Sequence, residues 1–112
     1  MTTTNTIHNT HVEPLTSPRT GEPVKNQYVI TSGDCRAFQS YSSLIAVYDW
    51  SENVLTLGYD WDYSVTTMKY LQVFLRDYCW SIYREMPDGK SGADSIRKAI
   101  KSGLIKYDPS MK

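Results

Sequence analysis

The sequence predicts an α+β fold, namely a four-stranded antiparallel meander of two hairpins packed against one long helix, plus a short C-terminal helix. Two observations support this prediction. Between residues 27 and 59, short runs of β-branched and aromatic residues alternate with turn signals, which is typical of consecutive antiparallel strands. From residue 64 onward, apolar residues recur every three or four positions, as they do on one face of a helix.

The chain length and composition suit one small domain preceded by an N-terminal arm. The chain has 112 residues, of which 40% are hydrophobic and 12% are aromatic. Residues 1–14 are rich in Thr and Asn and show no apolar periodicity, so we expect them to be disordered. The run SPRTGEPVKNQ continues the arm with turn-forming residues. We therefore expect a disordered or extended arm over residues 1–23 and a single domain over residues 24–112.

Four short runs account for the predicted meander. QYVIT (27–31) ends in the turn signal Ser-Gly-Asp and is followed by CRAFQSYS (35–42), which predicts a first hairpin. SLIAVYDW (43–50) ends in Ser-Glu-Asn and is followed by VLTLGY (54–59), which predicts a second hairpin. Because few residues connect the runs, an antiparallel meander is favoured over a parallel sheet.

The long helix is predicted to begin after Ser64. The Ser64 side chain can accept hydrogen bonds from the first free backbone N–H groups, and Asp62 just before it suits the positive end of the helix dipole. Pro-Asp-Gly at 87–89 marks the end of the helix. The predicted apolar stripe consists of Met68, Leu71, Phe74, Leu75, Tyr78 and Ile82.

A shorter helix is predicted from about Ala93 to Ser102. Its buried stripe would contain Ile96, Ala99 and Ile100, and Gly103 is a natural residue for the left-handed position after a helix. The apolar residues that follow Gly103 can then pack back on the domain.

The net charge is zero, but the charges are divided along the chain. Residues 34–62 contain five acidic residues and a single arginine. The segment from residue 90 to residue 106 contains one acidic residue and five basic ones, which are Lys90, Arg97, Lys98, Lys101 and Lys106. This basic set predicts a nucleic-acid-binding face as one alternative, and an ordinary solvated helix face as the other.

The cysteines and the hydropathy pattern indicate an intracellular protein. Cys35 and Cys79 lie far apart in the sequence and form no CxxC motif, so we expect two reduced thiols rather than a disulfide or a zinc site. No run of apolar residues is long enough to cross a membrane, and no secretory signal is visible at the N-terminus. We therefore expect a cytoplasmic location.

Motifs for catalysis are missing from the sequence. It contains no GxSxG, P-loop or GxGxxG motif, and its two histidines, His8 and His11, fall in the predicted arm. We therefore predict no enzymatic activity, no cofactor and no metal. A hydrolase that depends on the carboxylates Asp60 and Asp62 is a weaker alternative, because two carboxylates before a helix more often serve capping and solubility.

Aromatic and acidic residues occur together at the ends of the second predicted hairpin. An ordinary aromatic core is the simpler interpretation, but tyrosine and tryptophan are also favoured in binding surfaces. Base stacking normally requires neighbouring Lys or Arg, whereas carboxylates suit a basic protein surface. The residues that we predict to bind a partner are Tyr48, Asp49, Trp50, Tyr59, Asp60, Trp61 and Asp62.

The strings FQSYSSLIAVYD and WDYSVTTMKYLQVFL, with PRTGEPVKNQYVI ahead of them, resemble a family of small uncharacterised proteins. Members of this family occur largely in bacteriophages, plasmids and other mobile elements of bacteria. The resemblance covers residues 17–75, and SIRKAIKSGLI near the C-terminus resembles the basic helix that ends many members. The function of the family is unknown, so the resemblance implies a setting in which small accessory proteins often antagonise host defence, regulate transcription or bind nucleic acid.

These observations lead to one functional prediction and one alternative. We expect a non-enzymatic binding protein of a phage or mobile element, most concretely an anti-CRISPR-like inhibitor that docks on a nucleic-acid-binding host protein such as a CRISPR effector. The alternative is a small nucleic-acid-binding accessory or regulatory protein that uses the basic C-terminal helix. The open edges of the predicted meander would also allow a homodimer.

Overall fold

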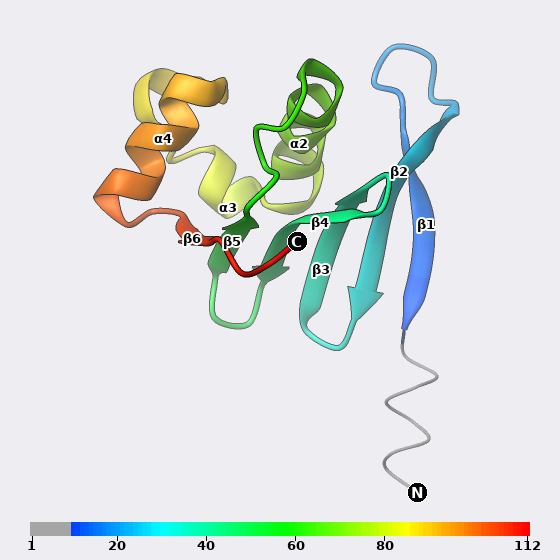
Figure 1. Cartoon of the computed structure of the whole chain (residues 1–112), viewed down its shortest axis with the longest axis horizontal. Coiled ribbons are helices and arrows are strands. Elements are labelled where there is room, and N and C mark those ends of the chain that lie inside the picture. Colours follow the sequence, from blue (N-terminus) through cyan, green and yellow to red (C-terminus); the bar gives the residue numbers. More distant parts are fainter. Residues whose placement is uncertain (1–9) are drawn as a thin grey trace, which may run out of the picture.

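The computed structural model describes residues 10–112, which form a six-stranded sheet with helices packed against one of its faces (Figure 1). Neighbouring strands follow the order of the chain. The first five strands are antiparallel, and the sixth pairs with the fifth in parallel. The strands are β1 (His11–Thr16), β2 (Pro23–Ser32), β3 (Cys35–Ser40), β4 (Ser43–Asp49), β5 (Val54–Gly58) and β6 (Lys106–Asp108).

The α+β class and both predicted hairpins are confirmed, since β2 pairs with β3 and β4 pairs with β5. The predicted count of four strands is wrong, because β1 and β6 extend the meander at its two edges. β1 lies within the predicted arm, where His11–Thr16 pair with β2 and Leu15 is fully buried. The part of the arm prediction that concerns residues 1–9 lies outside the described residues.

A bulge in β4 modifies the predicted alternation of buried and exposed residues. Phe38 pairs with Ala46, whereas the next residue of β3, Gln39, pairs with Leu44, so Ile45 is an extra residue in its strand. As a result, Ile45 and Ala46 are both buried although they are neighbours in the sequence. Strict alternation would have placed them on opposite faces of the sheet.

The helix after β5 begins as predicted. In α2 (Val65–Tyr78), the backbone N–H of Thr67 donates a 3.1 Å hydrogen bond to Ser64 Oγ, which caps the helix. Phe74 stacks on Phe38 of β3 with 5.7 Å between the ring centres, so the helix packs across the middle of the sheet.

The prediction of one uninterrupted long helix is wrong, because the helix breaks at Cys79 and a short helix, α3 (Trp80–Tyr83), follows. The apolar periodicity gives no sign of this break. The Cys79 N–H still donates to the Leu75 carbonyl as in a helix, and Ile82 beyond the break is buried like the predicted stripe. Cys79 is itself fully buried, and neither Gly nor Pro stands at the break.

The C-terminal helix is confirmed. A 3-10 turn (Pro87–Gly89) leads to α4 (Ala93–Ser102), which buries Ile96 and Ala99. Gly103 ends α4 in the left-handed region, at φ 89°, and Ile105 then packs into the core. Among residues 10–112, no helix is long and apolar enough to cross a membrane.

Candidate functional site

The predicted partner-binding residues fall into two groups at opposite ends of β5. Tyr48, Asp49 and Trp50 lie at the β4–β5 turn, where β5 begins. Residues 59–62 follow the other end of β5 and lead into α2. Since a strand rises by about 3.3 Å per residue, the five residues of β5 separate the two groups by about 16 Å. The predicted set therefore does not form one continuous surface.

Tyr48 belongs to the core. Its side chain is only 5% exposed, and its hydroxyl donates a 2.6 Å hydrogen bond to Asn53 Oδ1. Ser81 of α3 donates to the same Asn53 oxygen at 2.6 Å, and its Oγ lies 2.8 Å from the Tyr48 hydroxyl. This buried tyrosine thus connects the sheet to α3, which is the structural role that the polar tip of a core tyrosine usually has.

Asp49 and Trp50 also make local contacts. Asp49 Oδ1 accepts hydrogen bonds from the Ser51 hydroxyl at 2.7 Å and from the backbone N–H groups of Ser51 and Glu52, which lowers the pKa of Asp49. The guanidinium of Arg36 lies 4.6 Å from the centre of the Trp50 ring. Asp49 therefore orders the turn, and Trp50 is partly covered by Arg36.

Three adjoining hollows surround the segment between β5 and α2. The first has a volume of about 470 Å³ and is lined by residues 59–63 together with Arg97, Ile100 and Tyr107. The second has a volume of about 420 Å³ and is lined by residues 40–43, Ile45, Asp60, Tyr63 and Thr67. The third runs along the start of α2 to Arg97 of α4, and Tyr63 lines all three hollows. We call the residues that line these hollows the junction surface.

Exposed aromatic side chains are concentrated on the junction surface. Of the eight large hydrophobic or aromatic side chains that are exposed among residues 10–112, five line its hollows. They are Tyr41 (56% exposed), Tyr59 (55%), Tyr63 (78%), Val65 (87%) and Tyr107 (42%). Of these five, only Tyr59 belongs to the predicted partner-binding set. Tyr107 reaches the surface through the parallel pairing of β6 with β5, for which the sequence contains no signal.

The two carboxylates of the junction surface have different surroundings. Asp62 Oδ2 pairs with Arg97 at 3.3 Å, and the Arg97 guanidinium lies 5.5 Å from the ring centre of Trp61. Trp61 is only 6% exposed and thus mainly supports the fold. Asp60 is half-buried and accepts a 3.1 Å hydrogen bond from the Ser43 hydroxyl. None of the ion pairs that residues 10–112 form includes Asp60.

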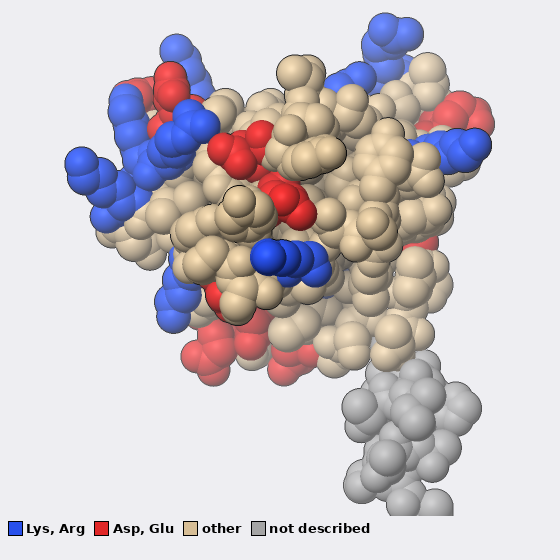
Figure 2. All heavy atoms as spheres, in the orientation of Figure 1, with Lys and Arg blue, Asp and Glu red and all other residues tan. Residues whose placement is uncertain are grey.

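The predicted basic set is only partly available to a ligand. Arg97 pairs with Asp62 and Asp94, and Lys98 lies 3.4 Å from Asp88. Figure 2 shows Lys and Arg atoms gathered over α4, with Asp and Glu atoms among them. The remaining members, Lys90, Lys101 and Lys106, are exposed and come from the end of the 3-10 turn, from α4 and from β6. The five residues therefore do not form a uniformly basic patch.

Both cysteines are free thiols. Cys79 is fully buried, and burial raises its pKa. Cys35 on β3 is half-buried, and its pKa is raised by burial and by the nearby carboxylates of Asp49 and Asp34. Within the part of the chain that the structure describes, no three His, Cys, Asp or Glu side chains are grouped so that they could hold a metal ion.

The comparisons with known proteins place the chain in a family without assigning its activity. A family of unknown function (DUF8033) matches residues 10–88, from β1 to the 3-10 turn. The match includes the segment between β5 and α2, with its carboxylates Asp60 and Asp62. No curated protein and no solved structure matches the chain.

Proposed function

The chain belongs to the family of unknown function DUF8033, and we propose that it is a non-enzymatic binding protein that docks through the junction surface on a basic surface of a partner protein. One observation carries the proposal. Four exposed tyrosines, Tyr41, Tyr59, Tyr63 and Tyr107, surround the carboxylates Asp60 and Asp62 in adjoining hollows.

This combination of side chains suits protein recognition. Tyrosine buries a large area at a small cost in side-chain entropy and keeps a hydroxyl for hydrogen bonding, so it is enriched where proteins bind each other. Contiguous exposed apolar groups on a protein often mark an interaction site. The two carboxylates add complementarity to a positively charged partner, which favours specificity and fast association.

The proposed partner is a host defence complex of a bacterial cell, most concretely a CRISPR effector, and the proposed setting is a phage or another mobile element. A protein that holds nucleic acid needs a basic surface, because phosphate contacts supply much of its affinity. The tyrosines and the carboxylates Asp60 and Asp62 of the junction surface can face such a basic site, and Lys69 and Arg97 lie beside them. The protein would then act as an anti-CRISPR-like inhibitor in the cytoplasm of the host.

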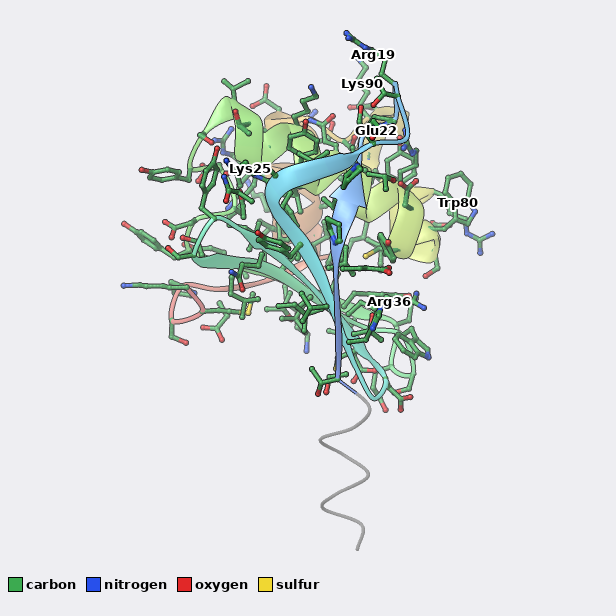
Figure 3. All side chains as sticks on the ribbon, turned by 90° about the vertical axis from the view of Figure 1, so that its right-hand side faces the viewer. Arg19, Glu22, Lys25, Arg36, Trp80 and Lys90 are labelled. Carbon is green, nitrogen blue, oxygen red and sulfur yellow. The ribbon has the colours of Figure 1, made fainter. Side chains whose placement is uncertain are left out.

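A plaque assay tests this proposal. The wild-type chain is expressed in a host whose CRISPR effector targets the infecting phage, beside a Tyr59→Ser/Tyr63→Ser variant. Trp80→Ser is the matched control, because Trp80 is 58% exposed but lines none of the three hollows, and it projects away from the molecule in Figure 3. We expect the wild type and the control to restore plaques and the double variant to lose this effect. Equal plaque numbers with all three proteins, or no protection by the wild type, would contradict the proposal.

A further inference from the structure

The second hollow of the junction surface contains a carboxylate, Asp60, that has no basic partner among residues 10–112. Two of its hydroxyl groups bind each other, since Thr67 Oγ1 lies 3.1 Å from Ser40 Oγ, and Thr67 Oγ1 also accepts a 3.1 Å hydrogen bond from Ser64 outside the hollow. Asp60 accepts one hydrogen bond, from Ser43, and forms no ion pair with any residue from 10 to 112. No Lys or Arg lines this hollow. Asp60 is therefore the group that is free to bind a cation.

Two tyrosines, Tyr41 and Tyr63, line the same hollow, and hydrogen bonds fix their backbone. Tyr41 has a φ of 55°, a left-handed conformation that is uncommon for a residue other than glycine. Its N–H donates to the Asn26 carbonyl at 2.7 Å, and its own carbonyl accepts from Gln39 Nε2 at 2.7 Å. The N–H of Tyr63 donates to the Asp60 carbonyl at 3.0 Å, which links the backbone of Tyr63 to that of Asp60.

The chain itself shows how a guanidinium fits such surroundings. In the adjacent hollow, Arg97 lies against the Trp61 ring and pairs with Asp62. The planar guanidinium can lie on an aromatic ring and still donate hydrogen bonds from its edge to a carboxylate. Tyr41, Tyr63 and Asp60 offer the same two kinds of contact, but no arginine of this chain occupies them.

We propose that the second hollow is a socket for an arginine side chain of the partner protein, which lies against Tyr41 and Tyr63 and donates to Asp60. This inference rests on the proposed function and specifies its partner. An arginine is favoured over a lysine, because an ammonium group cannot stack on a ring through a planar face. Buried Ile45 lines the same hollow and offers apolar contact to the aliphatic part of the side chain.

A titration followed by NMR tests the socket on the full chain. The probes are three acetylated, amidated tripeptides, Gly-Arg-Gly, Gly-Lys-Gly and Gly-citrulline-Gly, and citrulline is the uncharged analogue of arginine. We expect the arginine peptide to bind about tenfold more tightly than the citrulline peptide, and the lysine peptide to fall between them. The largest shifts should occur at Tyr41, Asp60 and Tyr63.

A second experiment replaces the carboxylate of Asp60. Asp60→Asn keeps an oxygen that can accept from Ser43 but removes the charge, so we expect about tenfold weaker binding of the arginine peptide. Asp34→Asn, at an exposed turn outside the hollow, should leave the affinity unchanged. The spectrum of each variant shows whether it is folded.

The outcomes separate the socket from the proposed function. No detectable binding of the arginine peptide, equal affinity for the arginine and citrulline peptides, or an Asp60→Asn variant with unchanged affinity would overturn the socket. The plaque assay with Tyr59 and Tyr63 variants would be unaffected by such a result. Normal binding of the arginine peptide together with no protection of phage would instead support the socket and contradict the defence-inhibitor role.

Discussion

The guanidinium of Arg97 lies 5.5 Å from the centre of the Trp61 ring, and its Nη2 is 3.3 Å from Asp62. Arg97 comes from α4 and Trp61 from the segment after β5, so this contact joins the C-terminal helix to that segment. Arg97 pairs with both Asp62 and Asp94, whereas Asp60 forms no ion pair with any residue from 10 to 112. The contact thus contributes to both the shape and the charge of the junction surface.

Arg97→Ala should strengthen binding of a basic ligand while it weakens the fold slightly. The ion pair is about half exposed, so its loss should lower the free energy of unfolding by no more than about 1 kcal/mol. Because Asp62 would then be unpaired, we expect the arginine peptide to bind about two- to fivefold more tightly. Urea unfolding and the NMR titration measure the two effects. Weaker peptide binding in a folded Arg97→Ala variant would contradict this account of the surface.

Tyr48→Phe should affect stability and not partner binding. The variant loses the hydroxyl that donates to Asn53 Oδ1, although Ser81 still donates to that oxygen, so we expect a loss of about 1 kcal/mol in the free energy of unfolding. Tyr41→Phe is the matched control for stability. The Tyr41 side chain is exposed, so removal of its hydroxyl should hardly change the free energy of unfolding. If Tyr48→Phe left the free energy of unfolding unchanged and abolished phage protection, Tyr48 would be a binding residue, as the sequence predicted.

The two thiols should differ in reactivity towards a thiol reagent at pH about 8. Cys35 is half-buried and should react in the native protein, slowly because its pKa is raised, whereas Cys79 is fully buried and should react only after unfolding. Mass spectrometry of the labelled protein identifies the modified residue, and Cys35→Ser should abolish labelling of the native state. Rapid labelling of Cys79 would show that the break between α2 and α3 opens readily.

Burial of Cys79 also predicts a pH dependence of stability. Burial raises the pKa of this thiol in the folded state, so the unfolded chain loses its proton first, at pH about 8.5. Above that pH the unfolded state binds fewer protons than the folded state, and the free energy of unfolding therefore falls as pH rises. Denaturant titrations between pH about 7 and 10 should show a smaller decrease in Cys79→Ala than in the wild type. If the free energy of unfolding fell equally with pH in the wild type and in Cys79→Ala, the raised pKa of Cys79 would be contradicted.

A gel shift with DNA and RNA tests the nucleic-acid alternative. Since Arg97 and Lys98 already pair with carboxylates, we expect no stable complex even at about 50 mM salt. A complex that weakens steeply with added salt, and that Lys101→Glu/Lys106→Glu abolishes, would favour the alternative instead. Both lysines are exposed, so this variant should fold normally.

Much of the fold could be predicted from local patterns. The four runs of residues 27–59 became β2 to β5, and the Ser64 cap and the Gly103 terminus were placed correctly, because turns and caps depend on neighbouring residues. β1 and β6 were not predicted, because neither strand has a clear local pattern. β1 contributes a single fully buried residue, Leu15, and β6 has only three residues, all exposed. Their strand conformation depends on pairing with distant partners.

The candidate site was less predictable than the fold. Asp60 and Tyr59 were identified from the aromatic and acidic character of their segment, and the structure places both on the junction surface. Tyr48 has the same character, yet it is buried and bonded to Asn53, which only the packing of α3 on the sheet decides. Tyr107 joins the surface because the chain returns after α4 to pair with β5.

Affinity purification from the native host during infection, followed by mass spectrometry, shows which protein the junction surface binds. Three baits are compared: the wild-type chain, the Tyr59→Ser/Tyr63→Ser variant and the Trp80→Ser control. We expect one nucleic-acid-binding defence protein to be recovered with the wild type and the control and to be lost with the double variant. Recovery of the same proteins with all three baits, or of no defence protein with any of them, would contradict this expectation.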